Sequence, residues 1–432
     1  MRCNILHEGA DQLTYEIRRI VAVANRLSEM GIEITWENIG DPVHKGEPLP
    51  AWIKEIIGDL VSQDRTYGYV PTEGVAQTRK FLAQQVNQRG GCQITPGDIL
   101  FFNGLGDALT KIMGFLNPQA RVICPSPSYP THGSAEAMHA GQKAITFALD
   151  PDNHWRPDLD ELERKVKTNR AIAGICLINP DNPTGSVYSQ SSLETIIDIA
   201  KKYDLFVVCD EIYTHIVYNG AKSLRLSNLI GDLPGLALRG ISKEYPWPGS
   251  RCGWIEIFNQ DKHPLFGQYI KSMLNLKMME VCSTSLPQYS IPRVMGDPRY
   301  KDHLNRRKAM FEERANEAYE IFSQINGIVV NRLQGAFYMP VLFEKGILTD
   351  QQTLPVHNSK ARNYIEDIVR GVAPDKRFVY YLLGAAGICV VPLTGFCYAR
   401  HGFRITLLEW DDEKRRRTWK TISHCIQDYL NS

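Results

Sequence analysis

Six short runs of almost continuous hydrophobic residues occur in the first two thirds of the chain, separated by segments with a helical pattern. The runs cover residues 98–104, 120–125, 171–180, 204–211, 236–242 and 252–257. Strands that are hydrophobic at nearly every position are typical of a parallel sheet that helices cover on both faces. Residues 106–116 and 189–203 place their hydrophobic side chains on one face of a helix. This alternation predicts an α/β fold with a mostly parallel, doubly wound sheet.

The pattern changes near residue 300. Residues 300–326 predict one long amphipathic helix, and shorter strand and helix patterns follow until a basic helix over residues 411–430 closes the chain. We therefore expect a second, smaller α+β domain. The large domain is predicted to span residues 46–300, and the small domain to contain residues 301–432.

The composition limits the kinds of partner. The 432 residues are enough for two domains, and a formal net charge of +1 gives no global field that would attract nucleic acid. The N-terminal segment lacks the apolar core of a secretory signal, and no run of about 18 apolar residues predicts a membrane span. We expect a small-molecule partner, with recognition carried by local charge.

Ten cysteines are scattered along the chain without a C-x-x-C pair. Some of them, such as Cys176 and Cys209, lie inside hydrophobic runs. This pattern favours buried, reduced thiols in a cytoplasmic protein over disulfides or a metal site.

Residues suited to binding follow several of the predicted strands, where ligand sites of open α/β sheets form. Leu105 and Gly106 lie in a glycine-containing turn, Asn103–Asp107, that leads into a helix, where backbone N–H groups can approach an anion. Tyr129 follows the next strand, and its aromatic face could stack on a planar ring. Each feature has an ordinary alternative: a tight strand–helix turn, or a tyrosine packed in a loop.

Two further strand ends carry more specific signals. The run NPDNPTG, residues 179–185, makes a rigid turn that leaves the Asn182 amide free to donate a hydrogen bond. Asp210 directly follows a hydrophobic run, so its carboxylate needs a partner. Tyr213 would lie beside Asp210 if the chain turns helical there. The alternative for this aspartate is a helix cap.

Ser242 and Lys243 follow another strand, ahead of a Pro/Gly-rich turn that ends at Arg251. A lysine desolvated at a strand end has a depressed pKa and can form a Schiff base, although it could also be an ordinary surface charge. Arg251 offers a bidentate fork to a phosphate. A phosphate cradle, a stacking aromatic, an amide, a phenol, a buried carboxylate and an imine-forming lysine are together what pyridoxal 5′-phosphate requires.

The order and spacing of these motifs resemble the fold-type I pyridoxal-phosphate enzymes, and among them the class I and II aminotransferases. The resemblance rests on NPDNPTG, DEIY, the Ser-Lys pair and GSRCGW, and it extends from NIGDP (38–42) to FRITLLE (403–409). It implies that residues 1–45 join the smaller domain. It also implies transfer of an amino group between an L-amino acid and a 2-oxo acid.

The resemblance implies a role for each candidate residue. Lys243 would form the internal aldimine and move the proton, Asp210 would pair with the pyridinium nitrogen, and Tyr129 would stack on the ring. The other contacts to the cofactor, at its 3′-oxygen and its phosphate, are implied for Asn182, Tyr213, Leu105, Gly106, Ser242 and Arg251.

Two implied roles concern the substrate and a second subunit. Arg404 resembles the arginine that binds the substrate α-carboxylate, with Gly40 and Asn182 in the same pocket; the alternative is a strand-edge arginine. Tyr69 in YGYVPTEG resembles the tyrosine that reaches the phosphate of the neighbouring subunit. It therefore implies a homodimer with a shared active site, the alternative being a simple turn tyrosine.

Two features depart from the family pattern. Gly240 stands where many members carry a serine three residues before the lysine, which puts one phosphate contact in doubt. The insertion over residues 345–387 is long, and we expect it to shape an element that covers the substrate.

His132 could be a partner of Asp210 or a surface loop histidine. Arg293 is a candidate for binding a substrate side chain by its position alone.

The preferred interpretation is a homodimeric aminotransferase. A pyridoxal-phosphate lyase or synthase on the same scaffold, such as a carbon–sulfur lyase or an aminocyclopropane-carboxylate synthase-like enzyme, stays open because it shares the cofactor site. A cofactor-binding regulatory module would need an additional DNA-binding segment, for which the N-terminal segment is too short. Alanine, aspartate, glutamate and aromatic amino acids all stay open as substrates.

Overall fold

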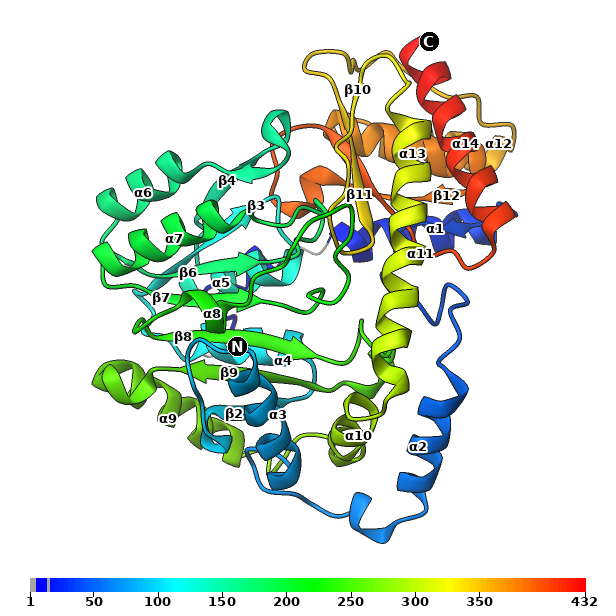
Figure 1. Ribbon diagram of the computed structural model, residues 1–432. Coiled ribbons are helices and arrows are strands. Elements are labelled where there is room, and N and C mark those ends of the chain that lie inside the picture. The colour runs from blue at the N-terminus through cyan, green and yellow to red at the C-terminus, as the bar shows by residue number, and fades with distance from the viewer. Residues whose placement is uncertain (1–4, 14–15) are drawn as a thin grey trace.

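An eight-stranded sheet forms the centre of the larger part of the molecule (Figure 1). The computed structural model describes residues 5–13 and 16–432. From one edge to the other, the strands are β2 (Ile99–Phe102), β9 (Gly253–Phe258), β8 (Gly235–Gly240), β7 (Phe206–Asp210), β6 (Ile172–Ile178), β3 (Arg121–Ser126), β4 (Thr146–Asp150) and β5 (Arg156–Pro157). Strands β4, β3, β6, β7 and β8 pair in parallel, whereas β9 and β5 run antiparallel to their neighbours. The predicted mostly parallel sheet is confirmed.

Helices pack on both faces of this sheet. One face carries α4 (Leu105–Gly114), α5 (Pro130–Ala140) and α9 (Pro264–Met278). The other face carries α2 (Ala51–Val61), α3 (Ala76–Gln88), α6 (Leu159–Thr168), α7 (Gln190–Lys202), the short α8 (Leu226–Leu229) and α10 (Ser285–Met295). In β7, Val208 packs toward the first set and Val207 toward the second. Covering on both sides explains why β2, β7, β8 and β9 are buried at every residue and hydrophobic at nearly all of them.

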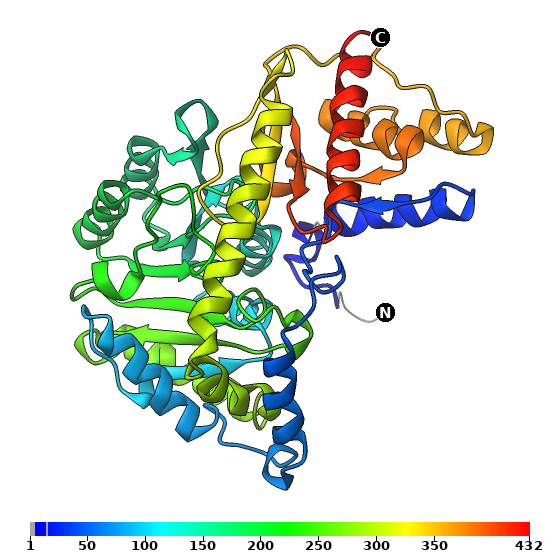
Figure 2. The ribbon, with the colours of Figure 1, turned by 45° about the vertical axis from the view of Figure 1, so that its right-hand side comes forward.

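A smaller α+β part lies at the other side of the molecule (Figures 1 and 2). Its antiparallel sheet has the order β10 (Ile328–Val329), β11 (Tyr338–Phe343), β14 (Gly402–Thr406) and β13 (Val391–Pro392). Its helices are α12 (Ser359–Ile368), α13 (Pro374–Ala386) and α14 (Asp412–Leu430). The N-terminal helix α1 (Glu16–Glu29) packs here too, because β1 (Thr35–Trp36) pairs in parallel with β12 (Ile388–Cys389).

The helix α11 (Arg299–Phe322) joins the two parts. Figures 1 and 2 show it in yellow-green, running from the large sheet to the small one. Near its N-terminal end, Tyr300 packs in the core of the large part, while Phe311 and Phe322 pack in the core of the small part. The single long helix that the amphipathic pattern predicts therefore contacts both cores.

The structure confirms the six predicted strands, which correspond to β2, β3, β6, β7, β8 and β9, and the fold class. It places residues 345–387 differently from our expectation, because this segment folds into α12 and α13 within the small part. The limits of residues 46–300 and 301–432 stay predictions. Within the described part of the chain, no helix is both long enough and apolar enough to cross a membrane. Nine cysteines there are free thiols, and Cys3 lies outside the described residues.

Candidate active site

A cavity of about 740 Å³ opens where the carboxyl ends of the parallel strands meet the small part. It brings together segments from both parts of the molecule and from the N-terminal region. Eleven of the residues singled out in the sequence line it: Gly40, Leu105, Gly106, Tyr129, Asn182, Asp210, Tyr213, Ser242, Lys243, Arg251 and Arg404. Three further candidates, Tyr69, His132 and Arg293, do not line it in this single chain.

Lys243 follows β8 in an irregular turn, and its amine donates a hydrogen bond to the Gly40 carbonyl oxygen at 2.6 Å. Burial lowers the pKa of this amine to about 8, and the charge of Asp41 opposes that shift. Three arginines reinforce the shift: Arg404, Arg251 and Arg307. Near pH 8 the amine therefore exists in both protonation states. Such an amine can attack a carbonyl in its neutral form and can also take up and release a proton.

Asp210 ends β7, and two partners fix its carboxylate. Its Oδ1 accepts the backbone N–H of Ile212 at 3.0 Å, and its Oδ2 lies 3.1 Å from Nε2 of His132. His132 is fully buried on α5. The structure thus places His132 beside Asp210, as the hypothesis expects, in a close contact that is not an aligned hydrogen bond. A carboxylate held in this way can face a protonated ring nitrogen within the cavity.

Arg404 lies on β14 between two aromatic rings. Its guanidinium carbon is 4.1 Å from the ring centre of Tyr338 and 4.9 Å from that of Phe396. Its Nη1 donates to Oδ1 of Asn182 at 3.1 Å, and its Nη2 donates to the Asn38 carbonyl oxygen at 2.9 Å. The side chain is 1% exposed, yet its Nε has no protein partner. A buried arginine with an unused donor at a cavity is suited to bind a carboxylate.

Gly40 and Tyr213 surround the same space. A Cβ atom at Gly40 would fall 2.0 Å from the Tyr338 hydroxyl, so only glycine fits there. The hydroxyl of Tyr213 donates to the hydroxyl of Tyr338 at 3.5 Å, and burial raises the pKa of Tyr213 well above its usual value. Tyr213 therefore stays protonated, and its single O–H can turn from Tyr338 to an oxygen in the cavity.

The N-terminus of α4 forms an open cradle. Gly104 has φ +87°, and a Cβ there would lie 2.4 Å from Nη2 of Arg251. A Cβ at Gly106 would meet nothing within 4 Å. Arg251 uses Nη1 and Nη2 only for long bonds to the carbonyl oxygens of Pro248 at 3.3 Å and Asn103 at 3.4 Å. Free N–H groups at a helix N-terminus beside an arginine are an anion site, as the sequence predicts.

The structure explains the glycine at position 240. Gly240 lies within β8 and does not line the cavity. A Cβ there would lie 3.0 Å from the Cys252 carbonyl oxygen and 3.1 Å from Cδ1 of Ile212. A serine would therefore press on the neighbouring strand, and the anion site consists of α4, Ser242 and Arg251 without it.

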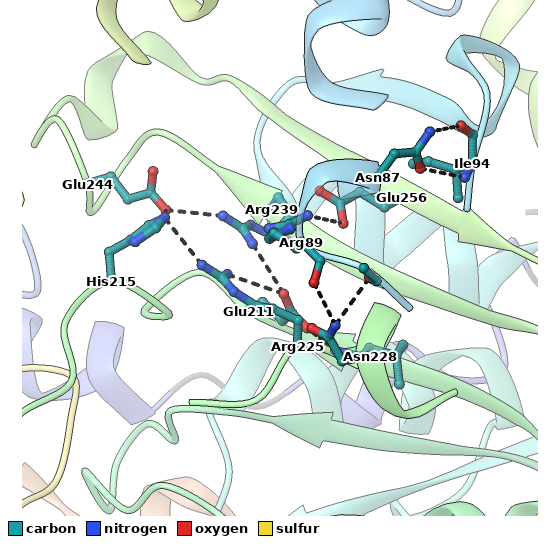
Figure 3. A network of polar contacts seen from close by, with 12 residues as sticks. Asn87, Arg89, Ile94, Glu211, His215, Arg225, Asn228, Arg239, Glu244 and Glu256 are labelled. Carbon is teal, nitrogen blue, oxygen red and sulfur yellow. Dashed lines mark hydrogen bonds and ion pairs between the residues drawn. The ribbon is translucent and has the colours of Figure 1, made fainter. Parts of the chain in front are cut away.

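A buried charged network lies behind the cavity, and nothing in the sequence patterns indicated it (Figure 3). Arg239 of β8 donates to Glu211 at 3.2 Å and to Glu244 at 3.4 Å, the residues that directly follow Asp210 and Lys243. Burial alone would raise the pKa of Glu244, but nearby cations lower it below its usual value. The network thus ties the turns after β7 and β8 to each other.

Arg293 is not part of the site in this chain. It lies on α10, forms an exposed ion pair with Asp59 and does not line the cavity of this single chain, so a role in binding a substrate side chain stays a prediction. The structure instead places Arg18 of α1 in the cavity lining. No residue of the insertion 345–387 lines the cavity, so that segment does not cover it here.

These residues fit pyridoxal phosphate. Arg251 and the N-terminus of α4 offer an anion cradle, Asp210 offers a fixed carboxylate, and Lys243 offers an amine with a lowered pKa. Tyr129 supplies the aromatic ring, because it lines the same cavity. This set of donors defines a site of the pyridoxal-phosphate type.

The chain belongs to the class I and II aminotransferases, since residues 35–422 match that family. It is a pyridoxal-phosphate-dependent transferase that acts on an amino acid and a 2-oxo acid. An uncharacterized aminotransferase of Methanocaldococcus jannaschii is 54% identical over 432 residues, covering 100% of both chains. A glutamate–pyruvate aminotransferase of Haemophilus influenzae is 34% identical over 332 residues, 76% of this chain and 80% of that protein.

A solved structure shares the whole architecture. The alanine aminotransferase from Pyrococcus furiosus matches with a TM-score of 0.84 at 26% identity, covering 97% of this chain and 99% of that one. These findings confirm the transferase prediction and do not favour the lyase or synthase alternative.

Proposed function

We propose that the protein is a cytoplasmic, homodimeric aminotransferase whose active site is the cavity around Lys243. The observation that carries this proposal is that the lowered-pKa amine of Lys243, the fixed carboxylate of Asp210 and the guanidinium of Arg404 line one cavity. The described cysteines are free thiols, which agrees with a reducing compartment.

Each of these groups has a separate task. Pyridoxal phosphate, when bound, withdraws electrons from the substrate α-carbon and so makes its proton acidic. The neutral amine of Lys243 would take up that proton and return it to the C4′ carbon of the cofactor. A pKa of about 8 permits both steps near neutral pH. Asp210, in contact with His132, would hold its carboxylate toward the ring nitrogen. Arg404 holds the substrate carboxylate between two aromatic rings that exclude water.

Replacing Lys243 tests this assignment. Lys243→Ala should abolish transamination because no other lysine of the described residues lines the cavity and could move the substrate proton. Amino-group transfer to an added 2-oxo acid is measured with purified protein. Lys262→Ala is the control, since Lys262 is exposed and pairs with Asp232 outside the cavity. Near-normal transfer by Lys243→Ala would contradict the proposal.

For the substrate, we propose glutamate and alanine, in agreement with the names of the relatives. Glutamate needs a second cation for its side-chain carboxylate. With Lys243 and Arg251 assigned to the cofactor and Arg404 to the α-carboxylate, Arg18 is the arginine of the cavity lining that stays available. Alanine places only a methyl group there and does not need this contact.

Arg18→Ala should therefore separate the two substrates. Loss of a charge-assisted contact raises KM for glutamate by roughly 10- to 100-fold, while kcat/KM for alanine changes little. Steady-state kinetics with each amino donor measures both values. Arg19→Ala is a matched control, because Arg19 is the next residue on α1 and does not line the cavity. An equal loss for both donors would argue against a glutamate-specific role.

Exposed side chains around Tyr69 support a dimer. Tyr69 is 86% exposed, and Tyr67, Met279 and Val281 are exposed large hydrophobic residues as well. The segments that carry them are adjacent, because Oγ1 of Thr72 donates to the Val281 carbonyl oxygen at 2.8 Å. A tyrosine so placed is free to reach the phosphate of a second subunit.

Complementation tests a shared site. Lys243→Ala and Tyr69→Ala chains are each expected to lose activity, but a mixed dimer contains one site with both residues intact. Co-expression of the two variants should restore roughly a quarter of wild-type activity, from random pairing and one working site in each mixed dimer. No recovery, together with a Tyr69→Ala chain of low activity, would mean that Tyr69 acts within its own subunit.

A further inference from the structure

A buried arginine outside the cavity holds the main chain of the catalytic lysine. Arg307 lies on α11, is buried, and donates through Nη1 to the carbonyl oxygen of Lys243. Its other two nitrogens form a bidentate pair with Glu47, Nε to Oε1 at 2.5 Å and Nη2 to Oε2 at 3.0 Å. Glu47 is buried as well. A guanidinium that donates to a carboxylate on one side and to a carbonyl oxygen on the other has a fixed orientation.

Glu47 belongs to the segment between β1 and α2, residues 37–50, which we call the strap. The strap carries Gly40, whose carbonyl oxygen accepts the Lys243 amine at 2.6 Å. It also carries Lys45, whose amine is buried between Glu37 at 2.9 Å and Glu409 of the small part at 3.0 Å. The strap is therefore bound to the small part through Lys45 and to α11 through Glu47.

Lys243 is thus held at both ends by one segment. Its amine bonds to the strap directly, and its carbonyl bonds to the strap through Arg307 and Glu47. The turn after β8 supplies no ladder hydrogen bond that would fix this carbonyl. One turn away on α11, His303 lies 2.9 Å from the carbonyl oxygen of Glu244, so one face of this helix contacts two successive carbonyl groups.

We propose that Arg307, oriented by Glu47, is a positioning residue: by holding the Lys243 carbonyl, it keeps the Lys243 amine in place against the strap. This proposal rests on the function proposed for Lys243. A buried ion pair contributes little net stability compared with apolar residues of the same size, so stability alone does not account for the pair. The hydrogen bond from Arg307 to the Lys243 carbonyl oxygen does account for it.

Arg307 also contributes to the charge that Lys243 experiences. The largest charge effects on this amine come from Asp41, which raises its pKa, and from three arginines that lower it: Arg404, Arg251 and, least of the three, Arg307. Neutralising Glu47 leaves the Arg307 charge without compensation and lowers the pKa of the Lys243 nitrogen further. Neutralising Arg307 leaves the Glu47 charge alone and raises that pKa.

Two variants with opposite shifts test the proposal. In the holoenzyme, the pH midpoint of the cofactor absorbance reports the nitrogen of Lys243. Glu47→Gln should move this midpoint to lower pH and Arg307→Gln to higher pH. Both should reduce kcat by about tenfold or more with a smaller change of KM, because a small displacement of the Lys243 amine from its position impairs proton transfer more than substrate binding.

Two further variants separate positioning from a merely structural role. Arg307→Lys keeps the charge but not the fork, so the midpoint should stay near that of the wild type while kcat still falls. Glu136→Gln is the matched control, since Glu136 forms a similar buried bidentate pair with Arg121 away from the cavity. It should lower the melting temperature without changing the midpoint or kcat.

The outcomes distinguish this proposal from the role of Lys243 itself. If Glu47→Gln, Arg307→Gln and Arg307→Lys all behave like Glu136→Gln, the pair is structural only and the proposal is overturned. If one variant does not fold, the remaining ones carry the same test. Persistence of the pH-dependent absorbance in Lys243→Ala would instead overturn the role of Lys243, which is a different result.

Discussion

Parallel pairing of β6, β7 and β8 is the constraint on which the site depends. In this register Ile178 lies opposite Asp210, and Asp210 lies opposite Leu238. The three strands therefore end at one level, and the residues that follow them meet in one place: Asn182, Asp210 and Lys243. Residues far apart in sequence become neighbours because parallel strands share an edge, and Arg251 lies at the same edge because it ends the turn from β8 to the antiparallel β9.

The second constraint is the handling of buried charge. The cavity gathers the cations Lys243, Arg251 and Arg404, and burial, reinforced by these arginines, lowers the pKa of Lys243 to about 8. Behind the cavity, Asp210 and Lys243 are each followed by a buried glutamate, and Arg239 joins the two glutamates. Surplus positive charge thus stays where anionic cofactor and substrate bind, while the buried charges of this network are paired.

The fold and most of the site could be predicted from the sequence because they rest on local signals. Hydrophobic runs predict strands that are buried on both faces, and the residue after each strand is at a known edge of the sheet. Asp210 and Lys243 are examples of this, and so is His132, whose contact with Asp210 the structure confirms.

Contacts between distant segments gave no such signal. Arg18 and Arg307 are charged residues on helices, and only the packing of α1 and α11 brings them to the cavity and to the Lys243 carbonyl. The same reason leaves Arg293 a prediction, since position along the chain does not determine the direction of a side chain. The long segment 345–387 could not be placed because its role depends on the small core that it completes.

The most direct test of the central claim is to locate the lysine that carries the cofactor. The holoenzyme is treated with a hydride reductant, which fixes pyridoxal phosphate to the nitrogen that holds it, and the digested peptides are analysed by mass spectrometry. The account predicts that the added mass lies on the peptide that contains Lys243, whose amine has the lowered pKa within the cavity. Cofactor attached to another lysine, or bound cofactor with no lysine labelled, would contradict it.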